Sequence, residues 1–527
     1  MRRHLLACAL ATAAAACSDR PADHPQRLPD PPRRPPNVLL IIWDTVRADR
    51  MSLYGHRRPT TPRLDLFARE ALVCERAVST GIWTLPSHAT LFTGFPESAH
   101  GVNSDFLWLH SSFETLAEIL QRAGYSTWLF AANPFVAEGC NLTQGFARVE
   151  HPWDDRWRDA TEEHVHAKLL PGDVNAPALP KPGEPDAARP VAKGLYKECA
   201  PVAVEALLTW LDRRDGRAPF FAALNLMEAH VPRIPSREAR RALMSEAEIE
   251  ASLRLDHRSD RLLEHLFGVR RFDAAGLELL SKVYDACLLD LDAATGRLLA
   301  ALEEGGLLDE TLVILTSDHG ENLGEHGLMD HKFCVYDTLV RVPLLLRLPS
   351  RLPPGRKQEP VSTLDLFATV LDLCGLEGAG GETPSRSFNA PDHPSLTAAP
   401  VFSEMLAVTP TAFDRIRRTQ PDFDPTPWLR TFRAVDWNGL RWIGASDGAV
   451  EVYDLRRDPG ETENLASVHG EFARSAQRAL DHWLGSFQHF AERRLPRREA
   501  REFRAEDLKG LGYVGPSPPD RPPGGGR

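Results

Sequence analysis

The sequence lacks the marks of several protein classes. Its 527 residues carry a formal net charge of −11 with no block of basic residues, which argues against nucleic-acid binding. No repeat of fixed period is visible. After the first 17 residues, no apolar run is long and clean enough to form a transmembrane helix. The eight cysteines include no CxxC pair and no metal-ligand spacing, so we expect buried thiols with at most one disulfide.

The N-terminal residues have the pattern of an export signal. Arg2 and Arg3 precede an apolar, alanine-rich stretch at 5–16, which is too short to span a bilayer. Residues 14–17 (AAAC) resemble a bacterial lipobox, whose cysteine becomes the lipidated first residue of the mature chain. We therefore expect residues 1–17 to be a lipoprotein signal peptide and the chain to be exported. It would lie in the bacterial cell envelope or periplasm and meet the membrane only through a lipid on Cys17. A plain signal peptide with an incidental cysteine is the alternative.

Proline-rich segments flank or interrupt the predicted folded part. Residues 18–36 contain seven prolines and are expected to form an extended tether. Residues 513–527, rich in proline and glycine, are expected to be disordered. Residues 154–193, rich in proline and charge, are expected to be an inserted loop near the substrate side.

Short apolar runs alternate with helical patterns between residues 37 and 380. The runs are typical of strands buried on both faces and lie at 38–43, 127–130, 220–226, 312–316 and 343–347. The helical patterns lie at 113–123, 196–212 and 277–304. This alternation predicts an α/β catalytic domain at 37–380 with a doubly wound, mainly parallel sheet flanked by helices. Three short strands and a helix predict a small antiparallel sheet-and-helix subdomain at 400–512.

Two carboxylates follow predicted strands. Asp44 comes directly after the first strand, and Asp318, with His319 beside it, comes after the run at 312–316. In a doubly wound sheet the carboxyl ends of the strands form the ligand-binding edge, so these residues can converge there. Two aspartates and a histidine are a plausible set of ligands for a hard divalent cation. The alternative is that each aspartate is an ordinary loop or cap residue.

A third candidate lies in the segment 83–94 (WTLPSHATLFTG). Pro86 suits the first turn of a helix, which places Thr84 at the positive end of the helix dipole. Next to a divalent cation, such a hydroxyl can have its pKa lowered enough to attack a phosphorus or sulfur centre. The alternative is a simple N-cap, in which the threonine satisfies a backbone N–H.

Five stretches in order resemble the sulfatase family. They are residues 38–49 (VLLIIWDTVRAD), 83–94, 317–327 (SDHGENLGEHG), 341–348 (RVPLLLRL) and 453–465 (YDLRRDPGETENL). They follow one another in the expected order along most of residues 37–512. The resemblance implies the alkaline-phosphatase-like version of the predicted α/β fold.

The resemblance also assigns roles to matching positions. It implies that Asp44, Asp318 and His319 bind a metal, and that Thr84 is the nucleophile and touches the same metal. It further implies that His230 is a catalytic residue at the leaving group and that Lys332 contacts the anionic group. His88, Asn133 and His331 fall at or beside positions expected to bind substrate. Without the resemblance, His230 would be interpreted as a loop residue and Lys332 as a solvated charge.

Several positions depart from the family pattern. Sulfatases typically carry a cysteine or serine that is converted to formylglycine, and Thr84 stands in its place. Because threonine cannot be oxidised to that aldehyde, no formylglycine is expected. His88 replaces the arginine of the same motif, Asn133 replaces part of a Lys and His anion clamp, and Thr45 stands where many members have another acidic ligand. The tail residues 517–521 (SPPDR) fit the formylglycine motif but lack its structural context.

The sequence therefore predicts a metal-dependent sulfuric ester hydrolase with a metal-bound threonine nucleophile. The first alternative is a phosphodiesterase, phosphonate monoester hydrolase or phospho-group transferase of the same superfamily. The second is an inactive lipoprotein that binds a glycan. One divalent cation is expected, calcium by resemblance, with zinc or manganese also suited to a histidine ligand. The expected substrate is a small sulfated or phosphorylated ester, with glycans among the candidates.

Overall fold

The computed structural model describes residues 35–177, 193–387, 399–408 and 410–491. The described residues from 36 to 491 belong to one compact unit. The predicted signal peptide, Cys17, the C-terminal tail and almost all of the predicted tether lie outside the described residues. The boundaries predicted for the catalytic domain and the C-terminal subdomain stay predictions.

An eight-stranded sheet forms the centre of the fold, in the order β12-β2-β11-β7-β1-β6-β4-β5. Its strands are β1 (Asn37–Trp43), β2 (Leu72–Cys74), β4 (Ser126–Ala131), β5 (Arg148–Glu150), β6 (Phe220–Leu226), β7 (Thr311–Thr316), β11 (Leu344–Arg347) and β12 (Gly355–Lys357). Strands β7, β1, β6, β4 and β5 run parallel, whereas β11 runs antiparallel to both of its neighbours. All residues of β1, β6 and β7 are buried, as their continuous apolar runs predict.

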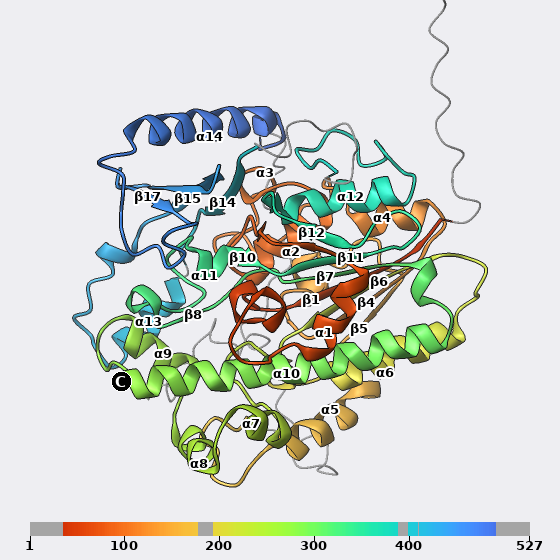
Figure 1. Cartoon of the computed structure of the whole chain (residues 1–527), viewed down its shortest axis with the longest axis horizontal. Helices are drawn as coiled ribbons and strands as arrows, with labels where there is room; N and C mark the ends of the chain where they lie inside the picture. The colour runs from red at the N-terminus through yellow and green to blue at the C-terminus, as the bar shows by residue number, and fades with distance from the viewer. Residues whose placement is uncertain (1–34, 178–192, 388–398, 409, 492–527) are drawn as a thin grey trace, which may run out of the picture. The chain divides into compact units, whose positions relative to one another are not determined.

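Helices cover both faces of this sheet (Figure 1). One face carries α6 (Ala200–Arg213) and the long α10 (Ala274–Glu304), and the other carries α2 (Thr84–Thr93), α4 (Leu116–Arg122) and α12 (Leu366–Leu373). The α6 layer is held partly by Trp210, whose ring stacks 5.6 Å from that of Trp128 on β4. Burying apolar residues on both faces explains why a mainly parallel sheet forms here. The predicted α/β class and mainly parallel sheet are confirmed.

A second sheet lies toward the C-terminus. It has four antiparallel strands, β14 (Val401–Met405), β15 (Phe432–Trp437), β16 (Leu440–Ala445) and β17 (Val450–Asp454), and α14 (Gly470–Ala491) packs against it. Trp483 of α14 stacks on Phe402 of β14 with ring centroids 4.4 Å apart. Buried Arg441 of this sheet pairs with Asp436 at 2.6 Å, Glu461 at 2.9 Å and Asp337 at 2.9 Å. Because Asp337 belongs to the 37–380 part of the chain, this cluster ties the two sheets together.

Smaller elements complete the described fold. The short strands are β3 (Ala77–Val78), β8 (Asn322–Leu323), β9 (Met329–Asp330), β10 (Arg341–Val342) and β13 (Val361–Ser362). The other helices are α1 (Pro62–Phe67), α3 (Glu97–His100), α5 (Asp155–Lys168), α7 (Arg237–Leu243), α8 (Glu246–Arg254), α9 (Ser259–Leu266), α11 (Asp337–Val340) and α13 (Pro410–Arg417). Helix α5 shows that the predicted loop at 154–193 is wrong for its first part. The helix forms because Trp157, Thr161 and Val165, on one face at helical spacing, are buried.

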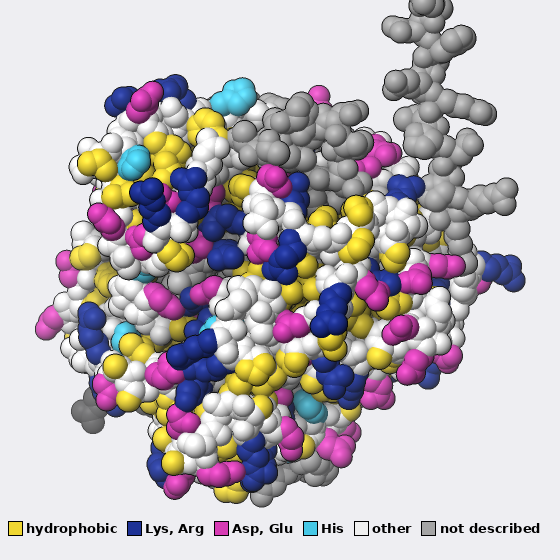
Figure 2. Space-filling model, in the orientation of Figure 1, with side chains coloured by type: hydrophobic (Ala, Val, Ile, Leu, Met, Phe, Trp, Pro, Cys, Tyr) yellow, Lys and Arg dark blue, Asp and Glu magenta, His cyan; other side chains and the backbone are white. Residues whose placement is uncertain are grey.

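The surface and the cysteines agree with the composition. In Figure 2 side chains of both charges are interspersed over the visible face, as expected for a chain without a basic block. Cys74, Cys140, Cys199, Cys287, Cys334 and Cys374 are all buried and free. Among the described residues, no helix has the length and apolar character needed to cross a membrane.

Candidate active site

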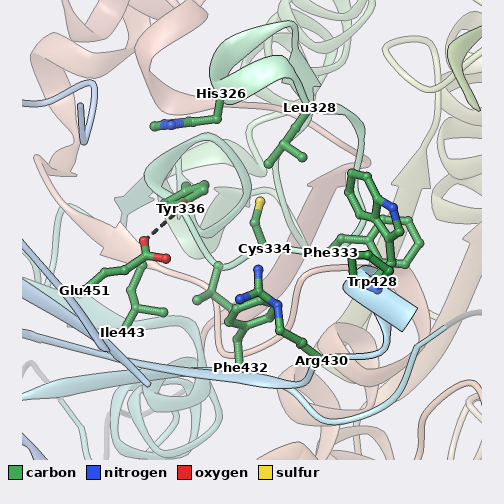
Figure 3. Close-up of a pocket in the computed structure, with 12 residues that line it drawn as sticks. His326, Leu328, Phe333, Cys334, Tyr336, Trp428, Arg430, Phe432, Ile443 and Glu451 are labelled. Carbon is green, nitrogen blue, oxygen red and sulfur yellow. Dashed lines mark hydrogen bonds between the residues drawn. The ribbon is translucent and has the colours of Figure 1, made fainter. Parts of the chain in front are cut away.

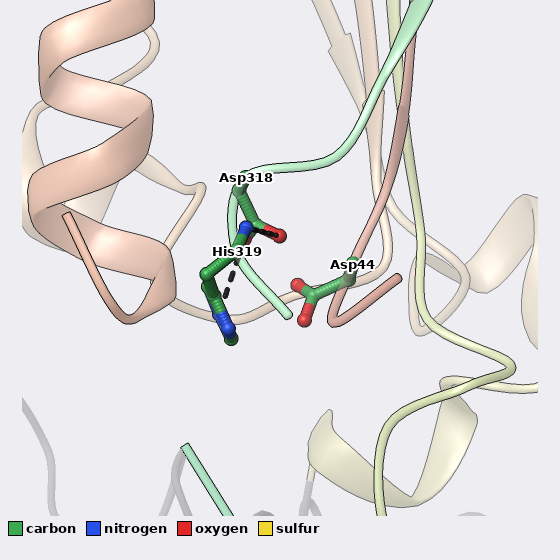
Figure 4. Close-up of side chains that lie close together, drawn as sticks. All are labelled: Asp44, Asp318 and His319. Atoms are coloured by element: carbon green, nitrogen blue, oxygen red, sulfur yellow. Dashed lines mark hydrogen bonds and ion pairs between the residues drawn. The ribbon is translucent and has the colours of Figure 1, made fainter. Parts of the chain in front are cut away.

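The ends of two neighbouring parallel strands bring the predicted metal ligands together. In the register of β1 and β7, Ile42 pairs with Thr316, so the segments that follow both strands leave the sheet at the same edge. Asp44, Asp318 and His319 lie in these segments and point toward one another in Figure 4. Each offers one ligand atom, and these atoms all lie within 4.8 Å of one another.

Backbone groups orient Asp318 and His319. The N–H groups of Thr45 and His319 donate to Oδ1 of Asp318 at 3.2 and 2.9 Å. Thr45 has a positive φ of 62°, which is uncommon for a β-branched residue and turns its N–H toward that carboxylate. The Nδ1 of His319 lies 2.9 Å from the carbonyl oxygen of Gly320, which leaves Nε2 directed to the site. Thr45 thus orients a candidate metal ligand through its backbone.

The three side chains fit a divalent cation. Asp44 Oδ1, Asp318 Oδ2 and His319 Nε2 are buried and have no hydrogen-bond partner among the described residues. Burial, and then the Asp318 carboxylate, raise the pKa of Asp44 to about 7, and burial raises the pKa of Asp318 to about 7. Burial, with His331 nearby, lowers the pKa of His319 to about 3, so its ring is neutral. Two buried carboxylates and a neutral imidazole are a donor set that a cation would stabilise.

Thr84 lies beside this group as the first residue of α2. Its hydroxyl does not cap the helix, because the N-cap position is occupied by Trp83, which makes no side-chain cap hydrogen bond. Instead, Nδ2 of Asn133 donates both to Thr84 Oγ1 at 3.0 Å and to Asp44 Oδ2 at 2.9 Å. One amide therefore joins the candidate nucleophile to a candidate metal ligand.

His88 lies one turn further along α2 and contacts the site from behind. Its Nδ1 is 2.9 Å from the carbonyl oxygen of Thr84 and 3.5 Å from Asp318 Oδ2, and its Nε2 is 3.4 Å from Nδ2 of Asn225. Burial lowers the pKa of His88 to about 3, so it is neutral where the family places a charged arginine. These contacts position Thr84 and Asp318, and a contact with substrate stays a prediction.

His230, His331 and Lys332 lie near the candidate metal ligands. The ring of His331 is 4.6 Å from that of His319 and 5.2 Å from that of His230. The Nδ1 of His230 lies 2.8 Å from the carbonyl oxygen of Val231, and burial holds the pKa of His230 well below its usual value. A neutral His230 does not act as a proton donor before substrate binds, which qualifies the role at the leaving group predicted from the sequence.

Glu321, Asp330 and His331 form a second cluster of possible metal ligands. Cations of the protein already face it, because Arg233 pairs with Glu321 at 2.8 Å and Lys332 pairs with Asp330 at 2.6 Å. Burial lowers the pKa of His331, but the charge of Asp330 and the hydrogen bonds to Asp330 and Glu321 together raise it to about 9. Because Arg233 and Lys332 already pair with its two carboxylates, we interpret this cluster as an ion-pair network.

The site is almost closed to solvent. Asp44, Thr84 and His319 are fully buried, and Lys332 is 6% exposed. A cavity of about 10 Å³ adjoins Lys332, lined by Trp83, His331 and Phe333 among others. The arrangement is therefore water-poor, which strengthens electrostatic interactions within it.

Two residues of the site were not predicted from the sequence. Asn225, at the penultimate position of β6, donates to Asp44 Oδ2 at 3.2 Å and accepts from the backbone N–H of Asn133 at 2.9 Å. A polar amide in an otherwise apolar run is the signal that identifies it. Glu321 lies two residues after His319, and its Oε1 is 3.6 Å from His331 Nδ1.

Comparison with known proteins places this geometry in a family. The model of the sulfatase family matches residues 36–376, more than half of the chain. The chain belongs to the sulfatase family. This sulfatase is 24% identical over 405 residues to an N-acetylglucosamine-6-O-sulfatase of Bacteroides thetaiotaomicron, covering 65% of the chain and 68% of the relative. It is 28% identical over 478 residues to arylsulfatase A of Homo sapiens, covering 82% and 83%.

A solved structure extends the comparison of folds. The phosphonate monoester hydrolase of Agrobacterium radiobacter superposes on this sulfatase with a TM-score of 0.63 at 22% identity, covering 86% of this chain and 96% of that one. The predicted family, the alkaline-phosphatase-like fold and the enzyme class of a sulfuric ester hydrolase are confirmed. The roles of individual site residues stay predictions, and the departures at Thr84, His88 and Asn133 concern the chemistry itself.

Proposed function

We propose that this sulfatase cleaves a sulfuric ester by attack of Thr84 Oγ1 beside one divalent cation. Asp44, Asp318 and His319 would hold the cation. The observation that carries this proposal is the amide of Asn133, which donates to both Thr84 Oγ1 and Asp44 Oδ2. Because the Thr84 hydroxyl and a proposed metal ligand bond to the same amide, a cation bound by that ligand could activate the hydroxyl.

The reaction exchanges one sulfur–oxygen bond for another. Thr84 Oγ1 loses its proton and bonds to the sulfur, the bond from sulfur to the ester oxygen breaks, and that oxygen leaves with a proton. A bound divalent cation supplies charge that lowers the pKa of the hydroxyl and neutralises the sulfate oxygens. Water then attacks the same sulfur and releases sulfate and the free threonine. The Asn133 amide donates to the developing charge on Oγ1 without having to move.

Positive charge from the protein binds the sulfate group. Lys332 and charged His331, held by Asp330, are proposed to contact its non-bridging oxygens. His230 is proposed to exchange a proton with the leaving oxygen. Because burial keeps the resting imidazole neutral, the negative charge of bound substrate must raise the pKa of His230 for this role.

The cation is proposed to be calcium. Two carboxylates supply oxygen ligands, which calcium prefers, and the family resemblance points the same way. His319 is also a suitable ligand for zinc or manganese, so metal analysis of the purified protein decides between them. No formylglycine is proposed, because residue 84 is threonine.

The substrate is proposed to be a small sulfated ester, and a sulfated sugar in particular. An N-acetylglucosamine-6-O-sulfatase among the relatives supports the sugar. We also keep the proposal that the chain is exported and lipid-anchored at Cys17, which rests on the sequence alone.

A phosphonate monoester or phosphodiester hydrolase is the second candidate. The observation that favours it is the proposed threonine nucleophile. A formylglycine intermediate releases sulfate as its carbonyl group re-forms, but a sulfated threonine has no such route and must be hydrolysed by water. The fold likeness to a phosphonate monoester hydrolase adds to it. The sulfatase family match over residues 36–376 keeps sulfuric ester hydrolysis as the first candidate.

The test compares aryl sulfate and aryl phosphodiester hydrolysis by the full chain and two variants. Thr84→Ala is expected to lose about 10³-fold or more of the preferred activity. Thr93→Ala is the matched control. Thr93 is a buried threonine of the same helix, and its hydroxyl donates to the carbonyl oxygen of Ala89 and accepts from the N–H of Phe95. An intact-mass increase of one sulfuryl group on rapidly quenched protein identifies the intermediate.

The outcomes separate the candidates. Faster phosphodiester turnover that also needs Thr84 selects the second candidate. A Thr84→Ala protein with near-normal activity refutes the nucleophile. Absence of any turnover with calcium, zinc or manganese, together with retained sugar binding, selects the inactive glycan-binding lipoprotein.

A further inference from the structure

A cavity of about 320 Å³ lies outside the reaction centre, between the segment 326–336 and the C-terminal sheet. Both parts of the chain contribute to its lining (Figure 3): His326, Phe333 and Tyr336 come from the first, and Trp428, Phe432 and Glu451 come from the C-terminal part. This volume is at the small end for ligand pockets and suits one ring-sized group.

Aromatic rings form the walls of this pocket. Phe333 and Trp428 meet edge to face with ring centroids 5.3 Å apart, and His326 stacks on Tyr336 at 4.2 Å. In Figure 3 these two pairs lie on different sides of the pocket, so two aromatic surfaces bound the cavity. Flat apolar surfaces of this kind pack against the faces of rings.

Opposite charges also line the cavity. The guanidinium of Arg430 lies 5.2 Å from the ring centroid of Phe432, and Figure 3 shows it directed into the pocket. Glu451 Oε2 accepts hydrogen bonds from the hydroxyls of Tyr336 at 2.9 Å and Tyr453 at 2.8 Å, which fixes the carboxylate. Arg430 also pairs with Asp447 at 3.3 Å, so each charge has a protein partner. A guanidinium has five N–H donors and a carboxylate has several acceptor positions, so a ligand with several hydroxyl groups can still bond to both, whereas a purely apolar ring cannot.

Phe333 connects this pocket to the reaction centre. It lines both the pocket and the small cavity beside Lys332, its neighbour in the chain. Its φ is +64°, and those of Asp330 and His326 are +67° and +55°. A bulky residue in the left-handed region is strained, and such strain persists where the surrounding structure holds a side chain in a required place. Here the strained backbone holds the ring of Phe333 where it lines both cavities.

We infer that this pocket binds a non-reacting sugar ring of the substrate, next to the sugar that carries the sulfate. The inference deepens the proposed function and rests on it for the identity of the substrate. Aromatic surfaces would pack on the ring face, and Arg430 and Glu451 would bind its hydroxyls. The sulfatase would then prefer a sulfated disaccharide or longer chain to the matching monosaccharide.

Binding measurements test the pocket without depending on turnover. Isothermal titration calorimetry is performed on the full chain carrying Thr84→Ala, with calcium, using disaccharides from heparin and chondroitin and the monosaccharide N-acetylglucosamine 6-sulfate. At least one disaccharide is expected to bind about ten-fold or more tightly than the monosaccharide. Adding Trp428→Ala is expected to remove that advantage while leaving monosaccharide affinity within about two-fold.

Two further variants keep the test decisive. Arg430→Gln changes a partly exposed side chain, so it reports on the pocket even if Trp428→Ala does not fold, and it is expected to weaken disaccharide binding several-fold. Leu429→Ala is the matched control. Leu429 lies between Trp428 and Arg430 in the chain, is 56% exposed and is not among the residues that line the pocket.

The inference is overturned if no disaccharide binds more tightly than the monosaccharide, or if the disaccharide advantage survives both Trp428→Ala and Arg430→Gln. It is also overturned if nothing binds. Failure of the proposed function has a different signature, because it shows as absence of aryl sulfate turnover by the unmodified protein, which this binding experiment does not use.

Discussion

Binding of the divalent cation to the metal-depleted protein is expected to depend steeply on pH. The purified protein is treated with a chelator and then titrated with calcium at several pH values between 5 and 8. Asp44 and Asp318 have a pKa of about 7 in the cation-free site, so both are largely protonated at pH 5. The cation must displace these protons, whereas His319, with a pKa of about 3, has none to lose.

The magnitude follows from these pKa values. For a carboxyl with a pKa of about 7, the ionised fraction falls from about 0.9 at pH 8 to about 0.01 at pH 5, which weakens the affinity about 90-fold. With two interacting carboxyls that share protons, the total lies between about 10² and 10⁴-fold. The sign for stability is opposite to that of a salt-bridged aspartate. Because the folded-state pKa is raised, the cation-free protein loses up to about 4 kcal/mol per carboxyl as pH rises from about 4 through 7.

Calorimetry in buffers with different ionisation enthalpies measures both the affinity and the protons released. We expect release of more than one proton per cation at pH 6 and of almost none above pH 8. The Asp44→Asn variant should release fewer protons and bind more weakly at pH 8. An affinity that is the same at pH 5 and pH 8, or binding without proton release, would refute the assignment of these carboxylates to the cation.

Two further predictions concern residues that support the site and the fold. Asn225→Ala is expected to lower turnover and calcium affinity by about 10- to 100-fold, because Asp44 and Asn133 each lose a hydrogen-bond partner. Enzyme kinetics and calcium titration measure the two quantities, and values within two-fold of the unmodified protein would contradict the prediction. Arg441→Met is expected to lower the free energy of unfolding by about 3–5 kcal/mol, because the carboxylates of Glu461 and Asp436 stay buried with too little compensating charge. Urea denaturation measures this change, and a loss under about 1 kcal/mol would count against the prediction.

The central strands were predictable because their apolar runs are continuous. A strand buried on both faces needs such a run, and β6 was predicted with both of its ends correct. Strands β2 and β12 have three residues each, too few for any periodicity to be detected. Helix α5 was missed because its charged exposed face dominates the composition, while only a narrow buried face drives its packing.

The candidate site was predictable where residue type and strand end coincide. Asp44 and Asp318 met both conditions, and the structure brings them together. Asn225 escaped notice because a single amide inside an apolar run resembles a tolerated core residue until its partners are known. Glu321 was not predicted because its approach to His331 depends on a loop with the positive φ of Asp330, which no sequence pattern specifies.

The pairing of β1 with β7 has a consequence for the order of events during synthesis. The backbone of Thr45 holds the carboxylate of Asp318, a residue 273 positions later in the chain. A nascent chain that has not yet reached β7 possesses only one of the two carboxylates, and no cation can be captured by half of the site. The proposed metal would therefore play no part in the early steps of folding and would be loaded only once most of the polypeptide has been made.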